Sequence, residues 1–352
     1  MADTKAFLKR KNIEFSAKRY GIDALGAMAQ GLFCSLLIGT IIRTLGAQLH
    51  VPFLTDIGTY AMAVSGPAMA VAIGYALQAP PMVLFSLAAV GWAANAEGGA
   101  GGPLAVLIIA IIAAECGKAV SKETKVDILV TPAVTILVGV ALAKWIAPPI
   151  GAAAGKFGVL IDSATKLQPF WMGIAVSVLV GIALTLPISS AAICAALALT
   201  GLAGGAAVAG CCAQMIGFAV ISFPENGWGG LVSQGLGTSM LQMGNIVKNP
   251  RVWIAPTLTS AVTGPLATCL FGLRMNGAPV SSGMGTCGLV GQIGVYTGWV
   301  NDVASGAKAA ITAFDWLGLV LICFVLPAVI APVIHAAVRK LGWVQPGDLK
   351  LN

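Results

Sequence analysis

The residues best suited to chemistry lie in the stretch 223–256, where glycines separate polar and apolar side chains. An acidic residue at bilayer depth costs about 2.5–3.5 kcal/mol, so its presence in such a stretch predicts a functional role. Glu225 is the leading candidate for substrate binding, and the alternative is an interfacial carboxylate that caps a helix. The polar side chains that follow can hydrogen-bond a small-molecule substrate. The candidates among them are Asn226, Gln234, Thr238, Ser239, Gln242 and Asn245.

A second glycine-rich stretch, 276–298, offers backbone N–H groups together with hydroxyl and amide side chains. This combination suits a polyhydroxylated or anionic ligand. No Gly-Lys-Ser/Thr sequence follows the glycines, so the stretch does not match a nucleotide-binding P-loop. We expect it to line one cavity together with 223–256, and its candidate substrate-binding residues are Ser282, Thr286 and Gln292.

Two further acids, Glu97 and Glu115, are secondary candidates. Glu115 precedes Lys118 by three residues, and this helical spacing favours a structural ion pair. The eight cysteines form no Cys-x-x-Cys or His/Cys spacing, which is typical of small buried hydrophobes. The sequence therefore predicts no metal site and no cofactor. It also contains no Ser/His/Asp set from which a catalytic residue could be named.

The composition indicates which elements must position these residues. Hydrophobic residues make up 58% of the 352 residues, charged residues only 9%, and the mean hydropathy is +0.91. A soluble domain carries nearer a quarter charged residues. The chain is therefore predicted to be an all-α polytopic membrane protein in contact with the lipid bilayer. Its net charge of +7 lies near the N-terminus and in short loops, which indicates membrane orientation and no nucleic-acid partner.

The apolar runs predict about ten transmembrane helices with both termini in the cytoplasm. A basic amphipathic helix over 1–22 is expected on the cytoplasmic surface. The sequence Ser65-Gly66-Pro67 predicts a kink, and 148–168 is expected to be an interfacial connector. The spans are expected near 24–46, 58–77, 81–95, 103–121, 127–147, 169–187, 252–273 and 313–338, with two more in 188–223 separated near 201–205. We expect a scaffold and dimerisation half, 23–166, and a substrate-binding half with the hairpins, 167–352.

Two segments share the pattern Glu-x-Gly-x-Gly-Gly, namely 97–102 and 225–230. Structural repeats in transporters leave such similarities behind. Glycine bias in both segments could also produce the match by chance, and the pattern alone leaves both interpretations open.

Several motifs together carry a resemblance to a known family. They are FLKRKNIEFSAKRYGIDALGAMAQGLFCSLLIGTIIRTLG, NAEGGAGGP, KETKVDILVTP, ENGWGGLVSQGLGTSMLQMGNIVKNPRVWIAPTL and GMGTCGLVGQIG. The chain resembles the membrane-embedded IIC subunits of the bacterial sugar phosphotransferase system (PTS), and is closest to the perfringolysin-regulator-like, type 2 branch. The resemblance covers nearly the whole chain. It implies a homodimer in the bacterial inner membrane, with ten spans per protomer, two re-entrant hairpins and elevator-type movement.

At the expected binding site the chain differs from better-known IIC subunits in one respect. The run around Asn245, Asn249-Pro250 and Pro256 looks similar to the sugar-binding run of better-known IIC subunits. Where those subunits have a glutamate, this chain has Gln234 and Gly235, so the role of that glutamate does not transfer to Glu225.

The resemblance leaves two classes of function. The first is a sugar permease subunit that passes its substrate to a separate cytosolic IIB phosphocarrier, since no segment is large enough for a IIB or IIA domain. As an enzyme, the chain would be at most the membrane subunit of a sugar phosphotransferase. The alternative is a stand-alone ion- or proton-coupled transporter or sensor of a small acidic metabolite on the same scaffold.

Overall fold

The computed structural model describes residues 2–351, which are helical with no β-strand in that range. The chain divides into two compact units between Ala154 and Gly155. The boundary expected between the halves, after residue 166, lies further along the chain. Each unit is described by itself below.

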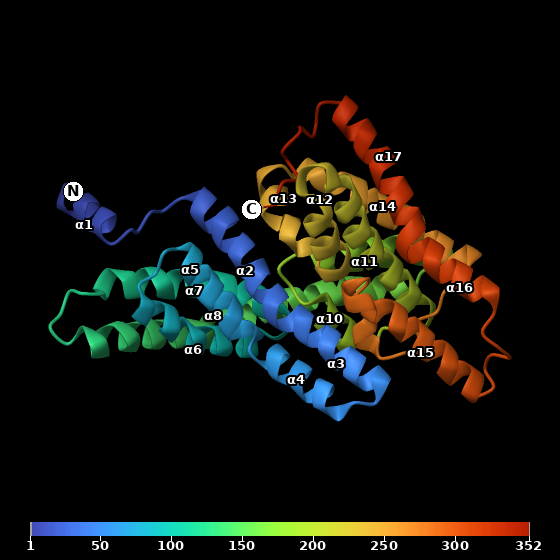
Figure 1. The fold of residues 1–352 in the computed structure, drawn as a ribbon, viewed down its shortest axis with the longest axis horizontal. Helices are drawn as coiled ribbons and strands as arrows, with labels where there is room; N and C mark the ends of the chain where they lie inside the picture. Colours follow the sequence, from blue (N-terminus) through green and yellow to red (C-terminus); the bar gives the residue numbers. More distant parts are fainter. Residues whose placement is uncertain (1, 352) are drawn as a thin grey trace. The chain divides into compact units, whose positions relative to one another are not determined.

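Unit 1 contains the helices drawn from blue to teal in Figure 1. They are α1 (Ala2–Arg10), α2 (Ala24–Leu32), α3 (Ile38–Leu49), α4 (Pro52–Ala63), α5 (Ser65–Ala76), α6 (Pro81–Gly98), α7 (Gly102–Val120) and α8 (Asp127–Thr165), the last of which continues into unit 2. π-helical turns at Arg19–Asp23 and Phe33–Leu37 join α2 and α3 into one helix of 31 residues, Arg19–Leu49.

The single amphipathic helix expected over 1–22 is wrong, because α1 ends at Arg10. Asn12 has a left-handed φ of 53°, and the N–H of Ile13 reaches back to the carbonyl of Leu8. This is the bonding pattern by which an αL residue stops a helix, and asparagine is among the few side chains that tolerate αL. Ile13 then buries its side chain, which holds the stop in place.

The kink expected at Ser65-Gly66-Pro67 is confirmed. Helices α4 and α5 meet at a bend of 48°. Pro67 has no N–H to donate to the preceding turn, so the helix cannot run straight through.

Helices α6 and α7 pack against each other across a short 3-10 turn, Gly99–Gly101. Gly99 has φ 49° and ψ −122°, a backbone conformation that is essentially confined to glycine. In unit 2, Gly227 interrupts α12 with φ 58° and ψ −156°. The two segments with the shared Glu-x-Gly-x-Gly-Gly pattern therefore both break at the third residue of that pattern.

The interfacial connector expected at 148–168 is wrong, because α8 runs unbroken for 39 residues through Pro132, Pro148 and Pro149. Each proline removes one backbone hydrogen bond, but the flanking turns keep theirs. Away from water, opening the helix further would leave more backbone groups unpaired.

Unit 2 contains α9 to α17 and the broken segments between them, drawn from green to red in Figure 1. The helices are α9 (Pro169–Thr185), α10 (Ser190–Ala196), α11 (Gly201–Ile221), α12 (Phe223–Val232), α13 (Met243–Lys248), α14 (Ile254–Pro265), α15 (Val290–Ala304), α16 (Ala313–Val320) and α17 (Leu326–Lys340). A π-helical turn, Leu321–Val325, makes α16 and α17 one rod of 28 residues, which confirms the last expected span.

Helix α11 is the centre of unit 2, since it packs against α9, α14 and α17. Nearly all of its side chains are buried. A Cβ on Gly210 would collide with the backbone carbonyl of Ser177 in α9. Glycine at this position therefore allows the backbones of α11 and α9 to approach closely, as small residues do in membrane helix pairs.

The two glycine-rich stretches, 223–256 and 276–298, have irregular backbone in their middle parts, as expected. Regular helices occupy the start of the first stretch and the end of the second. Between α12 and α14 the chain forms short π and 3-10 turns, Ser233–Gly237, Ser239–Gln242 and Pro250–Trp253. The second stretch has 3-10 turns at Pro279–Gly283 and Cys287–Leu289, and then becomes the regular helix α15.

By length and composition, five helices within residues 2–351 can cross a membrane, or six if α4 and α5 form one span. This falls short of the ten spans expected. The separate span predicted in the first part of 188–223 is wrong, because α10 has only seven residues, about 10 Å, against a hydrocarbon core of about 30 Å.

Candidate functional site

A chain of buried side-chain hydrogen bonds runs through the broken segment after α11. The amide nitrogen of Gln234 donates to Ser222 Oγ at 2.8 Å, and that of Gln242 donates to Gln234 Oε1 at 2.8 Å. Asn245 then donates to Gln242 Oε1 at 2.7 Å. Gln234 and Gln242 are fully buried. Buried amides linked in this way hold one another in fixed orientations, because each unpaired group would carry a desolvation cost.

The network ends on the last segment of the chain, residues 343–351, which we call the strap. The carboxylate of Glu225 accepts the backbone N–H groups of Gly347 at 2.9 Å and Leu349 at 3.0 Å. Asn226 donates to the carbonyl of Leu349 and accepts from the N–H of Leu351, both at 2.8 Å. The side chain of Leu349 is fully buried.

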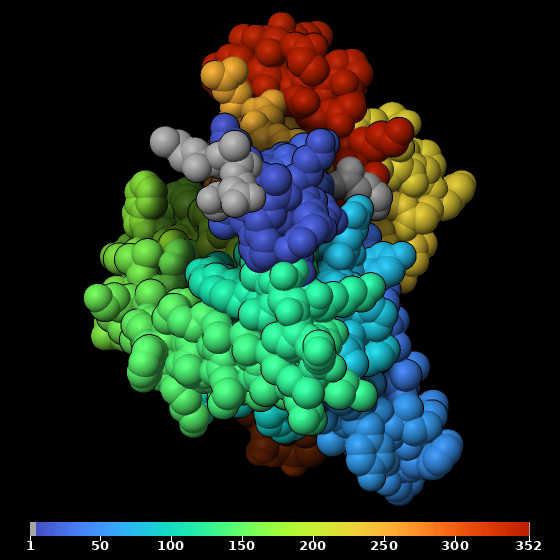
Figure 2. Space-filling view, turned by 90° about the vertical axis from the view of Figure 1, so that its left-hand side faces the viewer, coloured from blue at the N-terminus to red at the C-terminus, as the bar shows by residue number. Residues whose placement is uncertain are grey.

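Gln242 and Asn245 complete this contact. Gln242 Nε2 donates to the carbonyl of Leu349 at 2.9 Å, and Asn245 Nδ2 donates to that of Lys350 at 3.0 Å. Asn249 donates to the carbonyl of Trp343 at 3.0 Å, where the strap begins. In Figure 1 a thin red trace runs from the end of α17 back toward α12 and α13, and Figure 2 shows red atoms of the strap beside the yellow segment that holds these helices.

Five predicted residues therefore meet in one network, and two of their neighbours point elsewhere. Thr238 caps a 3-10 turn by accepting the N–H of Met240 at 3.1 Å. Ser239 forms a 2.7 Å hydrogen bond with Thr185 Oγ1 of α9. Glu225, Asn226, Gln242 and Asn245 bond the strap directly, and Gln234 joins them through Gln242.

Gln214 was missed by the sequence reasoning because it lies within the apolar run of α11. It is fully buried, and its Oε1 accepts from Trp253 Nε1 at 2.8 Å. Its Oε1 also accepts from Thr185, and its Nε2 donates to Thr257, both at 3.3 Å. The available signal was an amide side chain in the middle of a predicted span, where polar residues tend to face the protein interior.

The predicted residues of the second stretch bond to α11 itself or to the segments on either side of it in the sequence. Ser282 Oγ donates to the carbonyl of Leu199 at 2.6 Å, and Thr286 Oγ1 donates to that of Gly235. The bond from Thr286 joins the two glycine-rich stretches directly. Gln292 Nε2 lies 3.2 Å from Cys212 Sγ, and Gln292 Oε1 is buried without a hydrogen-bond partner among residues 2–351.

The comparison with protein families identifies the chain. A family model described as "Phosphotransferase system, EIIC" matches residues 22–351. The chain belongs to this family. Neither the curated proteins nor the solved structures that were searched include a match.

Membership makes the chain an EIIC subunit, the sugar-transporting permease subunit of a PTS. It is thus a multi-pass protein of the bacterial plasma membrane, in agreement with its long apolar helices. Separate EIIB partners are usual for such subunits. The network of amides and the strap therefore belong to a protein whose substrate is a small sugar.

The secondary candidates of this EIIC subunit form ion pairs within unit 1. Glu97 pairs with Lys144 at 2.5 Å. The pair expected between Glu115 and Lys118 is confirmed at 2.9 Å, and Tyr20 donates to the same carboxylate at 3.1 Å. Lys118 is almost fully buried and also donates to two backbone carbonyls. Both acids are thus engaged in ion pairs within unit 1.

The thiols and acids of residues 2–351 do not gather into a metal site. No group of three His, Cys, Asp or Glu side chains lies close enough to hold a metal ion within the part of the chain that the structure describes. The eight cysteines are free thiols.

Proposed function

We propose that this EIIC subunit binds a small sugar or sugar derivative on the polar network of unit 2 and moves it into the cytoplasm for a separate EIIB subunit. The single observation that supports this site is that the strap is held there through its backbone N–H and C=O groups. The proposed substrate-binding residues are Glu225, Asn226, Gln234, Thr238, Ser239, Gln242, Asn245, Ser282, Thr286 and Gln292.

The groups that hold the strap are of the kind that bind sugar hydroxyls. Glu225 accepts two N–H donors, and a carboxylate accepts hydroxyl hydrogens in the same way. Gln242 and Asn245 donate to carbonyl oxygens, and an amide donates equally to a hydroxyl oxygen. A hydroxyl both donates and accepts. A sugar can therefore replace the strap bond for bond, and the strap has to leave before it binds.

Gln292 supports a contribution from the second stretch. Its Oε1 is a buried acceptor without a partner in residues 2–351, a situation that costs about 1–3 kcal/mol. A sugar hydroxyl would satisfy it. Since Thr286 already bonds to Gly235, the second stretch is in contact with the segment that carries Gln234.

The wider cycle follows from the family resemblance. In this proposal unit 1 is the scaffold of a homodimer, and unit 2 carries the sugar by an elevator-type movement through re-entrant hairpins. The chain itself contributes binding and movement, and the phosphoryl group comes from the separate EIIB subunit.

The proposal is tested by loosening the strap. Gly347 has φ 96°, so Gly347→Ala strains the strap by about 1–2 kcal/mol. We expect tighter binding of the substrate sugar by this variant in thermal-shift titrations of the purified protein with a panel of sugars. Gly229→Ala is the matched control, since Gly229 lies in α12 with open space around it and no positive φ.

A transport measurement completes the test. Vesicles that contain the protein should accumulate phosphorylated sugar only when EIIB and a phosphoryl donor are supplied. Accumulation of unmodified substrate without EIIB, driven by a proton or ion gradient, would instead establish the stand-alone transporter. If Gln242→Ala binds the sugar like the wild type, the site lies elsewhere.

A further inference from the structure

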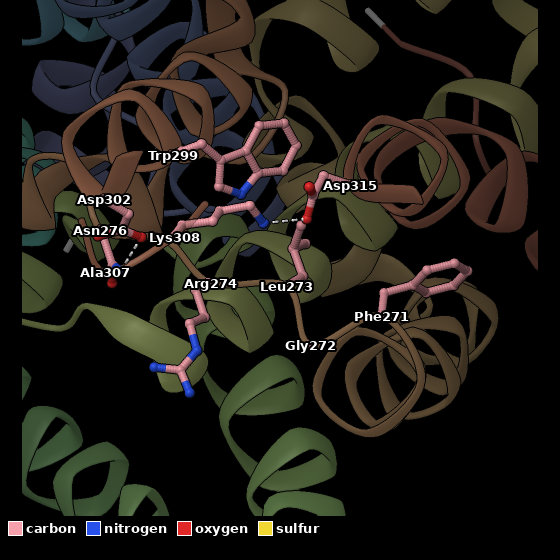
Figure 3. Close-up of a pocket in the computed structure, with 10 residues that line it drawn as sticks. All are labelled: Phe271, Gly272, Leu273, Arg274, Asn276, Trp299, Asp302, Ala307, Lys308 and Asp315. Atoms are coloured by element: carbon pink, nitrogen blue, oxygen red, sulfur yellow. Dashed lines mark hydrogen bonds and ion pairs between the residues drawn. The ribbon is translucent and has the colours of Figure 1, made fainter. Parts of the chain in front are cut away.

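Unit 2 contains a pocket of about 400 Å³ in a region separate from the amide network. Its wall combines two aromatic rings, an amide and four charged side chains (Figure 3). Pockets of about 300–1,000 Å³ hold small molecules, and the lower part of this range suits a monosaccharide. The residues on which the argument depends are Arg274, Asn276, Trp299, Asp302, Lys308 and Asp315.

The pocket and the strap lie at opposite ends of one long helix. Asp315 is in the first turn of the rod formed by α16 and α17, and the strap begins just after its last residue, Lys340. Twenty-eight helical residues rise about 42 Å, more than the hydrocarbon thickness of about 30 Å. If a sugar crosses the membrane along this helix, the pocket lies at one end of its path and the strap at the other.

The interior of the pocket is built from paired groups. Asn276 Nδ2 donates to Asp302 Oδ2 at 2.7 Å, and Lys308 Nζ forms a 2.6 Å ion pair with Asp315. The Lys308 ammonium lies 5.9 Å from the centroid of the Trp299 ring, which Figure 3 shows above the ion pair. These contacts fix the orientation of the amide and both carboxylates. Both oxygens of Asp315 are occupied, by Lys308 and by Thr312, whereas Asp302 Oδ1 is left to meet a hydroxyl group.

Arg274 is the positive group of the wall that has no counter-charge. It is exposed, and within residues 2–351 it makes no ion pair or side-chain hydrogen bond, whereas Lys308 is neutralised by Asp315. Asp302 also forms no ion pair within these residues, and its carboxylate accepts a hydrogen bond from the neutral Asn276 amide. A guanidinium binds a carboxylate through two parallel hydrogen bonds. A ligand suited to this wall therefore carries hydroxyl groups for Asp302 and Asn276 and one negative charge for Arg274.

We propose that this pocket is a second binding site, which takes a monosaccharide-sized sugar acid at the membrane face opposite the strap. The inference rests on the proposed function, because it makes the sugar acid the incoming substrate of the permease. Arg274 holds the carboxylate, and Asn276 and Asp302 hold hydroxyl groups.

The test compares D-glucuronate, D-glucose and inorganic phosphate as probes at equal ionic strength. We expect glucuronate to raise the melting temperature of the purified full-length protein and to bind at least about tenfold more weakly to Arg274→Gln, as loss of a charged hydrogen-bond partner implies. Asp302→Asn should weaken glucuronate binding as well. Lys156→Gln removes one exposed positive charge from α8 and should change nothing.

Each other outcome overturns the inference. Equal stabilisation by glucose would remove the role of the charge, and equal stabilisation by phosphate would make the pocket a general anion site. If Arg274→Gln and Asp302→Asn both bind glucuronate as the wild type does, glucuronate binds at a site other than this pocket. Gln242→Ala tests the proposed function separately. This variant should keep glucuronate binding at this pocket and lose transport. Normal transport by Gln242→Ala contradicts the proposed function alone.

Discussion

The carboxylate of Glu225 accepts a 3.0 Å hydrogen bond from the backbone N–H of Leu349, which lies 124 residues further along the chain. The bond joins the first turn of α12 to the strap. It places the leading acidic candidate in contact with a segment whose own sequence shows no sign of a binding role. The predictions below test what this contact and its neighbours contribute.

Glu225→Gln should loosen the strap without unfolding unit 2. A hydrogen bond to a charged acceptor contributes about 1.5–3 kcal/mol and one to a neutral acceptor about 0.5–1.5. We therefore expect the amide hydrogens of Gly347 and Leu349 to exchange about 5–30 times faster, which hydrogen-exchange mass spectrometry measures. Asp162→Asn, which loses only an exposed ion pair with Lys166, is the control. Unchanged exchange at the strap contradicts the prediction.

Gln242→Ala should destabilise unit 2 and remove sugar binding at the amide network. It leaves Gln234 Oε1 without a partner in a buried network and removes one of the two acceptors of Asn245 Nδ2, at a cost of about 1–3 kcal/mol. Thermal unfolding in detergent measures the first effect, and sugar titration the second. Ser233→Ala should stay near the wild type, because its hydroxyl bonds only to a carbonyl of its own helix.

Gly210→Ala should separate α11 from α9. The added methyl group meets the carbonyl of Ser177, and overpacking of this kind costs about 1–3 kcal/mol. Gly155→Ala is the matched control, because its Cβ would meet open space in α8 and alanine is the better helix former by about 0.5–1 kcal/mol. The two variants should shift the melting temperature in opposite directions. A Gly210→Ala protein as stable as the control would show that this close approach is not needed.

The N-terminal segment should detach from unit 1 at low pH. A hydrogen bond from Lys11, aided by Arg10, lowers the pKa of Glu123 below its ordinary value of 4.5. Since the folded state has the lower pKa, the contribution to stability is complete above pH 4.5 and is lost as the pH falls through the lowered value.

The mobility of a spin label at Ala6→Cys, in a variant without Cys34 and Cys269, measures this detachment. Glu123→Gln should show a mobile label at every pH. A label whose mobility in the wild type does not change below pH 4.5 would show that these ion pairs do not anchor the segment.

The loop between α7 and α8 should face the cytoplasm, as positive charge near the ends of spans indicates. Single cysteines at Lys122 and Lys125 should resist an impermeant thiol reagent added to intact cells and react after the cells are opened. Labelling from outside would reverse the orientation that we expect for unit 1.

Several features of this protein are determined by residues that are close together in the sequence. Apolar composition identifies the membrane class, and the spacing of Glu115 and Lys118 predicts their ion pair. Pro67 predicts the bend after α4, because a missing N–H acts within one turn. The glycines of 223–256 predict an interrupted helix. In each case the cause lies within a few residues of its effect.

Other features were decided by the tertiary structure. Nothing near Glu225 indicates that Gly347 and Leu349 would occupy its carboxylate, and nothing near Gln214 indicates its contacts with Trp253 and Thr185. The bonds of Gln214 depend on how α9, α11 and α14 pack, and those of Glu225 depend on the strap reaching α12. Closing long loops to form them has to be offset by burial along all the helices at once. A local pattern can thus show which side chains are able to bind a hydroxyl, while the packing of distant segments determines which of them are free to do so.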